Sequence, residues 1–335
     1  MSLGDSLQQD AEQFRARYQA VKDQIGRVIV GHDEIVHGVL TCMFVGGHCL
    51  LEGVPGLGKT MLIRTLAQTL DLQFSRIQFT PDLMPSDILG TNMVVESPDG
   101  KRSFEFQKGP IFTQICLADE INRATPKTQS ALLETMQEGT VTAAGTRYVL
   151  EKPFFVLATQ NPIEQEGTYS LPEAQLDRFM FFIHVQYPTV EEERQIARAT
   201  TGGSTPALAK LITAEQVLAF QQLIQRVPVP DHVYDAAVDL VRMTRPNSPD
   251  APAWIKKWVT WGAGPRAVQY LIRGAKAHAV LHGNLLVGME DIEAVALPVL
   301  THRILTNFQA QAEGISSPKV VERLIEELRG AKAEK

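Results

Sequence analysis

The sequence predicts an α/β protein in which a parallel sheet covered by helices is followed by an all-α unit. Three observations predict this fold class. Apolar strand-like segments alternate with amphipathic helices over the first part of the chain. A glycine-rich loop within residues 50–66 joins one such strand to the helix that follows it. From about residue 188 the strand signal nearly disappears, and helical periodicity takes over.

The composition is that of a water-soluble globular protein with one large or two ordinary domains. The 335 residues are 44% hydrophobic and 21% charged, and 32 basic against 38 acidic residues give a net charge of -6. A net negative charge disfavours binding to the phosphate backbone of a nucleic acid, but it does not exclude a local basic patch. No run of about 18 apolar residues exists, and the N-terminus has no signal-peptide core. We therefore expect no membrane span.

The three cysteines are Cys42, Cys49 and Cys116, and each lies in an apolar stretch. None has metal-ligand spacing, and an odd count without a framework is typical of reduced thiols in the cytosol. We expect small core residues and a cytoplasmic location. The scattered histidines show no ligand spacing either, so no metal site built from histidine or cysteine is expected.

The predicted elements of the first part begin with two helices, at 6–29 and 34–45. Strand and helix signals then alternate, and apolar strands separated by helices imply a parallel sheet covered on both faces. The elements that follow are a strand at 48–52, a helix at 59–70, strands at 74–79 and 114–118, a helix at 126–138, and strands at 154–159 and 179–185.

Two segments interrupt this alternation, and each is typical of a β-hairpin inserted between elements of the core. Residues 91–107 look like two short strands around a turn, and residues 139–152 look like a second hairpin that turns near Ala144 and Gly145. Each hairpin is either surface decoration or a functional insertion, because loops carry function only where something binds.

A breaker-rich segment at 200–210 marks the boundary between the two parts. We place the α/β unit at 1–200 and a helical bundle at 201–335. Trp254, Trp258 and Trp261 would share one helical face, which favours core packing over an aromatic-basic nucleic-acid patch. The predicted helices of the bundle are 213–226, 231–244, 264–281, 290–305 and 318–329.

The loop from Gly53 to Thr60 has the spacing G-x-x-x-x-G-K-T, the phosphate-binding loop pattern. Its glycines free backbone N–H groups to converge on phosphate oxygens, and the positive end of the next helix points at them. Lys59 would reach the β- and γ-phosphates, and the Thr60 hydroxyl would ligate Mg²⁺. A buried strand before the loop and an amphipathic helix after it disfavour the alternative, a glycine-rich turn with a surface lysine. The residues expected to hold a nucleotide are Gly53, Pro55, Gly56, Leu57, Gly58, Lys59, Thr60 and Met61.

A second apolar run, at 114–118, ends in Asp119 and Glu120. Two adjacent carboxylates at the end of a buried strand indicate a functional role, because burial of an unpaired charge destabilises the fold. Asp119 can hold Mg²⁺ through water, and Glu120 can deprotonate the attacking water as a general base. The alternative is a strand end whose acids merely face solvent. Asn161 could align that water and sense the γ-phosphate, although an Asn-Pro pair alone is more typical of a turn.

Three arginines gain interest in this context. Arg178 and Arg266 lie next to predicted element boundaries. A lone arginine is usually a surface charge or an ion-pair partner. In phosphoryl transfer, however, a guanidinium group at the γ-phosphate stabilises the charge of the transition state. Arg123 follows the acidic pair, and it either contacts a neighbouring subunit or makes a local ion pair with the strand end.

With its motifs in this order, the chain resembles the AAA+ ATPases, and within them the MoxR family. The resemblance covers nearly the whole chain, from VIVGHDEI to the helical tail, and its motifs together are highly specific. The blocks that carry it are LLEGVPGLGKT, QFTPDLMPSDILG, KGPIF, LADEINRATPKTQSALLETMQEGTVT, ATQNPIEQEGTYSLPEAQLDRFMF and GAGPRA.

The resemblance assigns a role to each candidate residue. Lys59 and Thr60 would be Walker A, Asp119 and Glu120 Walker B, and Asn161 sensor 1. Arg178 looks like the arginine finger and Arg266 like sensor 2, while Val30 and Gly31 match the segment beside the adenine. Whether Arg266 acts within its own subunit or across an interface stays open.

The hairpins resemble the helix-2 insert and pre-sensor-1 insertion of the clade that includes the magnesium-chelatase ATPase subunit and the MCM helicases. Departures from the family pattern are small. His32 stands where Gln is common, Ser170 where Pro is common, and Gly264 where Ser is common. The first bears on the contacts beside the adenine, and the other two bear on loop shape.

The resemblance implies a protein that binds ATP and Mg²⁺ and hydrolyses ATP as a ring oligomer, with a hexamer expected. It would remodel or mature a partner protein complex as a chaperone does, and it implies a separate partner with a von Willebrand factor A domain. One alternative is a DNA-acting motor related to MCM helicases, which the acidic balance and the missing DNA-binding module disfavour. Another is a non-hydrolysing nucleotide switch, which the complete set of Glu120, Asn161 and Arg178 disfavours.

Overall fold

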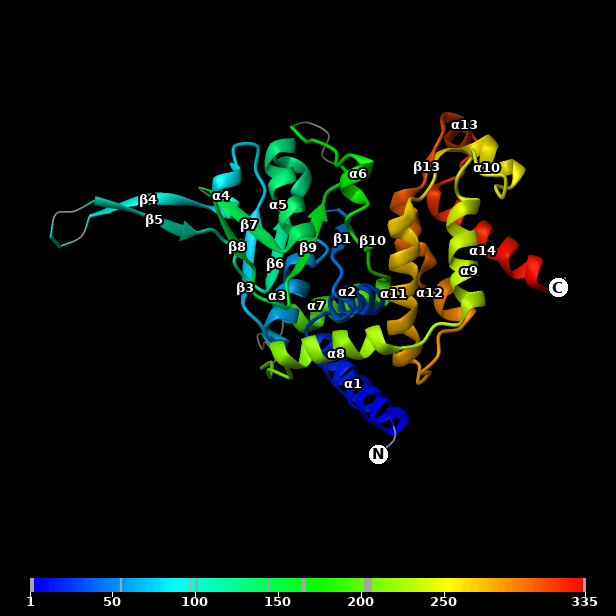
Figure 1. Ribbon diagram of the computed structural model, residues 1–335, viewed down its shortest axis with the longest axis horizontal. Coiled ribbons are helices and arrows are strands. Elements are labelled where there is room, and N and C mark those ends of the chain that lie inside the picture. The colour runs from blue at the N-terminus through cyan, green and yellow to red at the C-terminus, as the bar shows by residue number, and fades with distance from the viewer. Residues whose placement is uncertain are drawn as a thin grey trace.

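The computed structural model describes residues 3–54, 56–96, 98–99, 102–143, 145–163, 167–201 and 207–333. Pro55, Ala144 and part of the predicted boundary segment lie outside the described residues. The fold is the predicted one, an α/β unit with a parallel sheet and hairpin insertions, followed by a C-terminal helical lid (Figure 1).

The central sheet has five parallel strands in the order β10-β1-β9-β6-β3. The interior strands are almost entirely buried, as continuous apolar runs require when both faces of a sheet are covered. Because the strands are parallel, the residues that follow β1, β6 and β9 meet at one edge of the sheet. The five strands are β1 Cys49–Glu52, β3 Phe74–Gln78, β6 Ile115–Asp119, β9 Phe155–Gln160 and β10 Phe181–His184.

The two faces of the sheet pack against different helices. On one face, Leu51 and Leu117 belong to a core cluster that includes α2 (Asp33–Val45) and α3 (Lys59–Thr69). On the other face, Leu50 and Ala118 belong to a second cluster, which includes α5 (Pro126–Glu138). Successive strand residues thus alternate between two apolar layers.

The first helix, α1 (Leu3–Gly26), packs with α2 and α8 (Ala214–Arg226) through aromatic rings. The Phe14 ring lies 5.2 Å from that of Phe44 and 4.9 Å from that of Phe220, between ring centroids. These contacts join residues on both sides of position 200, so the first core cluster runs through both parts of the chain.

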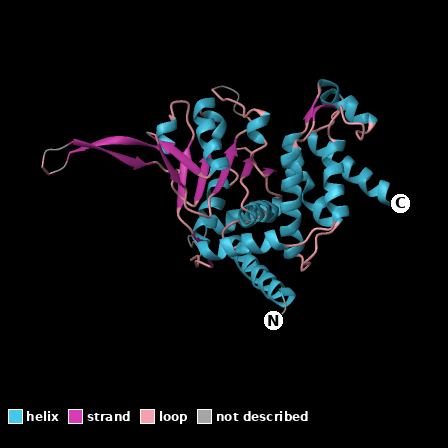
Figure 2. Ribbon diagram, in the orientation of Figure 1, coloured by secondary structure: helices cyan, strands magenta, loops and turns pink. Residues whose placement is uncertain are grey.

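Both predicted hairpins are present, and both are antiparallel. The first, β4 (Gly90–Glu96) with β5 (Arg102–Lys108), extends away from the body of the molecule (Figures 1 and 2). The second is β7 (Thr140–Ala143) with β8 (Thr146–Val149).

An aromatic cluster connects the two hairpins near their bases. The rings of Phe106 and Tyr148 stack with their centroids 4.5 Å apart. Phe112 meets both rings edge-on, at 5.9 Å from Phe106 and 6.1 Å from Tyr148. Each hairpin contributes one ring to this cluster, and Phe112, in the segment after β5, contributes the third.

The lid is helical, with one short two-stranded sheet, β12 (Val259–Trp261) with β13 (Leu305–Thr306). The predicted helix 290–305 therefore ends earlier than expected, and a 3-10 turn, η2 (Thr301–Arg303), leads into β13. The helices that follow α8 in this part of the chain are α9 Asp231–Met243, α10 Ala253–Trp258, α11 Pro265–Leu281, α12 Met289–Leu300, α13 Phe308–Ala312 and α14 Ser317–Ala333.

The prediction of one tryptophan face is wrong. Trp254 and Trp258 lie half-buried on α10, where the Arg323 guanidinium sits 4.5 Å and 5.3 Å from their ring centroids. Trp261 lies on strand β12 instead and is 68% exposed. The β-branched Val259 and Thr260 favour extended backbone, and pairing with β13 ends the helical periodicity before Trp261.

The shorter elements complete the chain. They are β2 Leu70–Asp71, α4 Pro85–Leu89, η1 Ile121–Arg123, α6 Glu173–Leu176, α7 Val190–Thr201 and β11 Ile212–Thr213.

The three cysteines are buried core residues, as expected. Within the described ranges, no helix combines the length and the apolar character needed to cross a membrane.

Candidate nucleotide-binding site

A cavity of about 420 Å³ lies at the edge of the sheet where β1, β6 and β9 end, beside the start of α3. The sequence singled out five residues of separate segments that all line this cavity: Lys59, Thr60, Asp119, Glu120 and Asn161. The parallel topology therefore assembles one site from three strand ends and one loop.

Three positions of the loop require glycine. At two of them the backbone has a positive φ, and at the third a side chain would collide with a neighbouring residue. Gly56 and Gly58 have φ of 84° and 73°, in the left-handed region that favours glycine. A Cβ atom at Gly53 would lie 2.8 Å from the Val185 carbonyl oxygen. Gly58 precedes α3, so the first backbone N–H groups of that helix open towards the cavity.

Lys59 is held by the loop itself. Its ammonium group donates to the carbonyl oxygens of Gly53 and Val54, the latter at 3.2 Å. Burial lowers the pKa of Lys59, whereas the nearby carboxylates of Asp119 and Glu120 act in the opposite direction. The loop thus keeps a cation beside the cavity, where phosphate oxygens could replace the two carbonyls.

Asp119 is buried, and both of its carboxylate oxygens have partners. Oδ1 accepts a hydrogen bond from Thr159 Oγ1 at 2.6 Å. Oδ2 accepts from Arg76 Nη2 at 2.7 Å and Nε at 3.2 Å, and from Thr60 Oγ1 at 3.4 Å. The carboxylate therefore does not face solvent, and Arg76 compensates the charge that burial would otherwise penalise.

Glu120 has a left-handed backbone, with φ of 56°. Such a conformation costs a non-glycine residue about 1–3 kcal/mol, and it persists where the surroundings over-determine it. Here the Glu120 backbone N–H donates to Thr159 Oγ1 at 2.9 Å. Its carboxylate accepts from Gln78 Nε2 at 2.7 Å and pairs with Arg123 Nη1 at 3.2 Å. Arg123 thus makes the local ion pair that was one of its two predicted roles.

Asn161 forms the expected turn and is one of the residues that line the cavity. Its Oδ1 accepts from the Ile163 backbone N–H at 3.1 Å, and its carbonyl accepts from Asn122 Nδ2 at 3.2 Å. The Asn161 side-chain Nδ2 is buried and has no hydrogen-bond partner among the described residues. Since buried donors are nearly always paired, this one is available to a ligand.

Val30 and Gly31 precede α2, next to the loop. His32 connects this segment to the loop, because its Nε2 lies 3.1 Å from the Leu57 carbonyl oxygen. A Cβ atom at Gly31 would lie 2.6 Å from Cδ of Glu192, which belongs to α7. The residue that departs from the family pattern therefore helps to position this segment.

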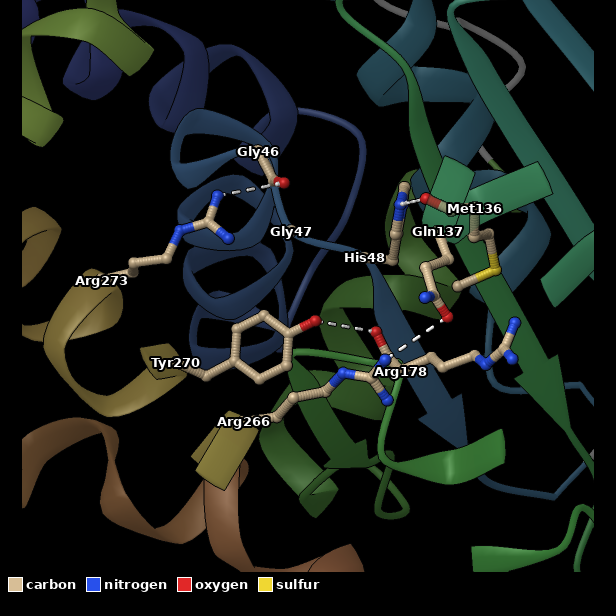
Figure 3. Close-up of a pocket in the computed structure, with 9 residues that line it drawn as sticks. All are labelled: Gly46, Gly47, His48, Met136, Gln137, Arg178, Arg266, Tyr270 and Arg273. Carbon is tan, nitrogen blue, oxygen red and sulfur yellow. Dashed lines mark hydrogen bonds between the residues drawn. The ribbon is translucent and has the colours of Figure 1, made fainter. Parts of the chain in front are cut away.

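Arg178 and Arg266 do not line the cavity beside the phosphate loop. They line a second cavity of about 200 Å³, together with Tyr270 and Arg273 (Figure 3). Arg178 Nη1 donates to the Leu133 carbonyl oxygen at 2.6 Å, while its Nε is buried without a partner among the described residues.

Arg266 is positioned by Asp177 and Gln137. Its Nη1 donates to Asp177 Oδ2 at 3.2 Å, and its Nη2 donates to Gln137 Oε1 at 3.4 Å. The Tyr270 hydroxyl donates to the Arg178 carbonyl at 3.1 Å, which ties α11 to the same segment (Figure 3). The fold thus brings the two predicted arginines together and keeps both away from the phosphate loop of the same chain.

Four residues with direct roles in these sites were not predicted from the sequence. Arg76 and Gln78 lie two residues apart on edge strand β3, in register with Leu117 and Asp119 of β6. Their alternation on one face of a predicted strand is the signal that could have identified them. The other two are Thr159, which contacts Asp119 from the end of an apolar strand, and Arg303, which contacts Asp177 from η2.

The residues present fit a magnesium ion. The Thr60 hydroxyl and the Asp119 carboxylate lie within 3.4 Å of each other. Magnesium ions in nucleotide sites bind through one or two carboxylate or hydroxyl oxygens and the substrate phosphates. Asp119 and Thr60 are such a donor set, and they face a cavity with room for phosphates.

Two family models match this chain. Residues 48–181 match the model described as "ATPase family associated with various cellular activities (AAA)", and residues 253–324 match the AAA lid domain.

Similar proteins cover nearly the full chain. Chaperone MoxR1 of Mycobacterium tuberculosis is 42% identical over 304 residues, which are 90% of this chain and 79% of that protein. Protein YeaC of Bacillus subtilis, uncharacterized, is 41% identical over 304 residues, 90% and 91% of the two chains. Protein MoxR of Methylorubrum extorquens is 30% identical over 318 residues, 90% of each chain. A crystal structure from Cytophaga hutchinsonii is 42% identical with a TM-score of 0.89, and the alignment covers 96% of this chain and 97% of that one.

Proposed function

Since this chain belongs to the MoxR family of AAA ATPases, we propose that it binds ATP with Mg²⁺ and hydrolyses it as a ring of identical subunits. The cycle would remodel or mature a partner protein complex. The observation that supports this most is the convergence of Lys59, Thr60, Asp119, Glu120 and Asn161 on one cavity.

Each residue of this cavity has a chemical task in the proposal. Lys59 exchanges the two loop carbonyls for β- and γ-phosphate oxygens, and the loop N–H groups bind the same phosphates. Thr60 and Asp119 would hold Mg²⁺. When bound, the ion would neutralise negative charge on the phosphates. Asn161 donates its unpartnered Nδ2 to the γ-phosphate or to the attacking water.

Glu120 is the proposed general base. Its carboxylate accepts a proton from water, and its contacts to Gln78 and Arg123 are both made by Oε2, so they orient the group while the other oxygen can act as the base. The complete set of catalytic groups disfavours a permanently non-hydrolysing switch.

Arg178 and Arg266 are proposed to act across a subunit interface. Neither lines the phosphate-loop cavity of its own chain, and Arg178 Nε has no hydrogen-bond partner among the residues that the structure describes. A guanidinium at the γ-phosphate of a neighbouring subunit would stabilise charge in the transition state, an effect worth about 10³–10⁵ in rate. Because Arg266 is fixed to Asp177, directly before Arg178, we place both in the same interface. A site shared in this way requires more than one subunit, and we propose a ring, with the hexamer that the family resemblance implies.

The partner is proposed to be a separate protein with a von Willebrand factor A domain. The extended β4–β5 hairpin is the surface best suited to contact a client, because Val94 and Phe104 are 57% and 78% exposed. Its exposed apolar side chains suit a protein client better than DNA, which disfavours the motor alternative. A chaperone-like role is consistent with the name of the relative from Mycobacterium tuberculosis. We also propose the division into an α/β core at 1–200 and a lid at 201–335, and a cytoplasmic location.

Phosphate release and nucleotide binding by the purified chain test the proposal. We expect ATP binding that requires Lys59 and slow hydrolysis that depends on Mg²⁺ and on protein concentration. A chain that binds ATP but releases no phosphate at any concentration would contradict the proposed ATPase activity.

A further inference from the structure

One buried hydroxyl group connects the two acidic residues of the candidate site. Thr159 is the next-to-last residue of β9 and is only 1% exposed. Its Oγ1 donates to Asp119 Oδ1 at 2.6 Å and accepts from the Glu120 backbone N–H at 2.9 Å. A backbone N–H can only donate, so the single hydroxyl proton is left for the carboxylate. Both bonds therefore form together in one orientation of the hydroxyl.

The bond to Asp119 decides which carboxylate oxygen faces the proposed metal position. Thr159 takes Oδ1, which leaves Oδ2 on the side of Thr60 Oγ1, at 3.4 Å. Because Mg²⁺ usually keeps several of its waters, a water-bridged contact at Oδ2 leaves the Arg76 ion pair in place. The last torsion of an aspartate side chain has only broad preferences, so a fixed partner on Oδ1 is needed to hold this orientation.

The bond from Glu120 holds an unusual backbone conformation. Among the described residues, Glu120 is the one non-glycine residue with a positive φ. Such conformations persist where the surroundings over-determine them, and they cluster at functional sites. The acceptor of the Glu120 N–H is a side chain of the neighbouring strand, so the bond fixes the peptide at which the chain leaves β6. That peptide sets the direction in which the Glu120 side chain starts towards the cavity that it lines.

We propose that Thr159 is the positioning residue for both acidic groups, Asp119 at the metal ion and Glu120 at the attacking water. This inference rests on the proposed function. Thr159 acts through these two residues, because its hydroxyl proton and its acceptor contact are both used on them. Outer-shell partners of metal ligands typically change metal affinity or activity by about 10–100-fold when they are removed, and we expect an effect in this range.

Thr159→Val tests the proposal, since valine keeps the branched shape and lacks the hydroxyl. A fluorescently labelled, non-hydrolysable ATP analogue is titrated into the full chain in excess EDTA and in excess Mg²⁺, and the ratio of the two affinities is the gain from the metal. We expect affinity in EDTA to stay within about threefold of wild type, while the gain from the metal falls about tenfold. The rate of phosphate release from ATP with Mg²⁺ should fall about 10–100-fold.

Matched variants separate positioning from a general loss of packing. Thr159→Ser keeps the hydroxyl and should restore both the gain from the metal and the rate. Thr159→Ala removes the hydroxyl without placing a methyl group against the Asp119 carboxylate, and it should reproduce the pattern of the valine variant. Thr135→Val is the control away from the cavity, because this buried hydroxyl donates to the Ala131 carbonyl oxygen within α5 at 2.9 Å. It should leave the gain and the rate unchanged.

A double variant tests whether Thr159 acts through Asp119. In an Asp119→Asn background the metal contact is already weakened, so adding Thr159→Val should lower the gain from the metal little further. An additional tenfold loss in that background would show that Thr159 acts independently of Asp119 and would overturn the proposal.

The remaining outcomes distinguish this inference from the proposed function. Urea unfolding identifies the variants that are folded. An unchanged gain and rate in folded Thr159→Val and Thr159→Ala proteins would reduce the hydroxyl to a structural contact and overturn the proposal. An equal loss of affinity in EDTA and in Mg²⁺ would overturn it as well, because the effect would then not depend on the metal. If the wild-type chain fails to bind the analogue under either condition, the proposed function itself is contradicted.

Discussion

Lys59 and Arg178 line two different cavities of one chain, the first beside the phosphate loop and the second beside α11. Phosphoryl transfer of the proposed kind needs an ammonium and a guanidinium at the same phosphate group. The guanidinium that lines the Lys59 cavity, that of Arg76, is paired with Asp119, and Arg178 of the same chain lines the other cavity. The separation of these two residues is therefore the structural reason to expect a shared site between subunits.

Glu120→Gln is predicted to bind ATP and to lose turnover. The amide keeps the shape of the side chain and its contact with Gln78, but it cannot accept a proton from water. We expect the rate of phosphate release to fall about 10²-fold or more while the dissociation constant for ATP stays within about threefold. Wild-type turnover in this variant would remove the general-base assignment. The variant should also retain the partner protein in an affinity capture with ATP.

Deletion of residues 94–105 is predicted to leave the fold and the basal ATPase rate largely intact while abolishing stimulation by a client. The deleted strand residues project from the body and bury little surface, so their loss should cost little stability. Circular dichroism and the basal rate check the first part, and a client recovered with Glu120→Gln checks the second. Loss of folding on deletion would show that the hairpin belongs to the structural core. Phe104→Ser, at a residue that is 78% exposed, is the matched point variant.

Arg303→Met is predicted to destabilise the protein strongly. The Arg303 side chain is 2% exposed and donates to Asp177 Oδ1 at 2.8 Å and to the Phe179 carbonyl at 2.6 Å. The change leaves Asp177 with Arg266 as its remaining ion-pair partner but removes several buried hydrogen bonds of Arg303, and we expect a loss of about 3 kcal/mol in the free energy of unfolding. Arg329→Met is the control, because Arg329 pairs with Glu293 at the surface and should contribute less than about 1 kcal/mol. Similar losses in both variants would contradict the assignment.

Stability is predicted to fall in acid partly through His48. Its Nδ1 accepts from the Val156 backbone N–H at 3.0 Å, and its Nε2 lies 3.1 Å from the Met136 carbonyl oxygen. These two bonds fit the neutral ring, and burial lowers the pKa of His48 from 6.5 to about 4.

The sign of the effect follows from proton uptake. Between pH 6.5 and 4 the unfolded chain binds a proton at His48 that the folded chain does not, so stability falls as pH falls through this window. The ring is only half-buried, so we expect His48 to contribute about 1–2 kcal/mol to this fall. Urea unfolding at pH 7 and pH 4.5 measures it, and His48→Gln should show a correspondingly smaller difference. An equal difference in both proteins would exclude His48 as a source.

Local patterns predicted much of the fold and of the phosphate-loop cavity. The strands before Gly53 and Asp119 are continuous apolar runs, and such runs are interpretable without knowledge of their neighbours. Trp261 shows where this fails, because pairing of β12 with β13, far away in sequence, overrides helical spacing. Arg76 was missed because a single arginine in a strand has no motif of its own. Only the register of β3 with β6 brings it to Asp119.

The position of Arg178 relative to Lys59 is likewise a property of topology. The local sequence predicted a functional role for both residues. It did not predict that one chain holds them in separate cavities, because that depends on the fold. The resemblance to AAA+ ATPases suggested an interface role, and the geometry of the described residues is compatible with it.

The most direct test of the shared site is the ATPase activity of a mixture of Lys59→Ala and Arg178→Ala proteins. Each variant alone should be nearly inactive, the first because it cannot hold the phosphates and the second because it offers no guanidinium to its neighbour. In mixed rings some interfaces pair an intact phosphate loop with an intact arginine, so mixing should restore part of the activity. Specific activity of the wild type should rise with protein concentration over the same range. No recovery on mixing, together with wild-type activity that is independent of concentration, would contradict the account that this protein works as a ring.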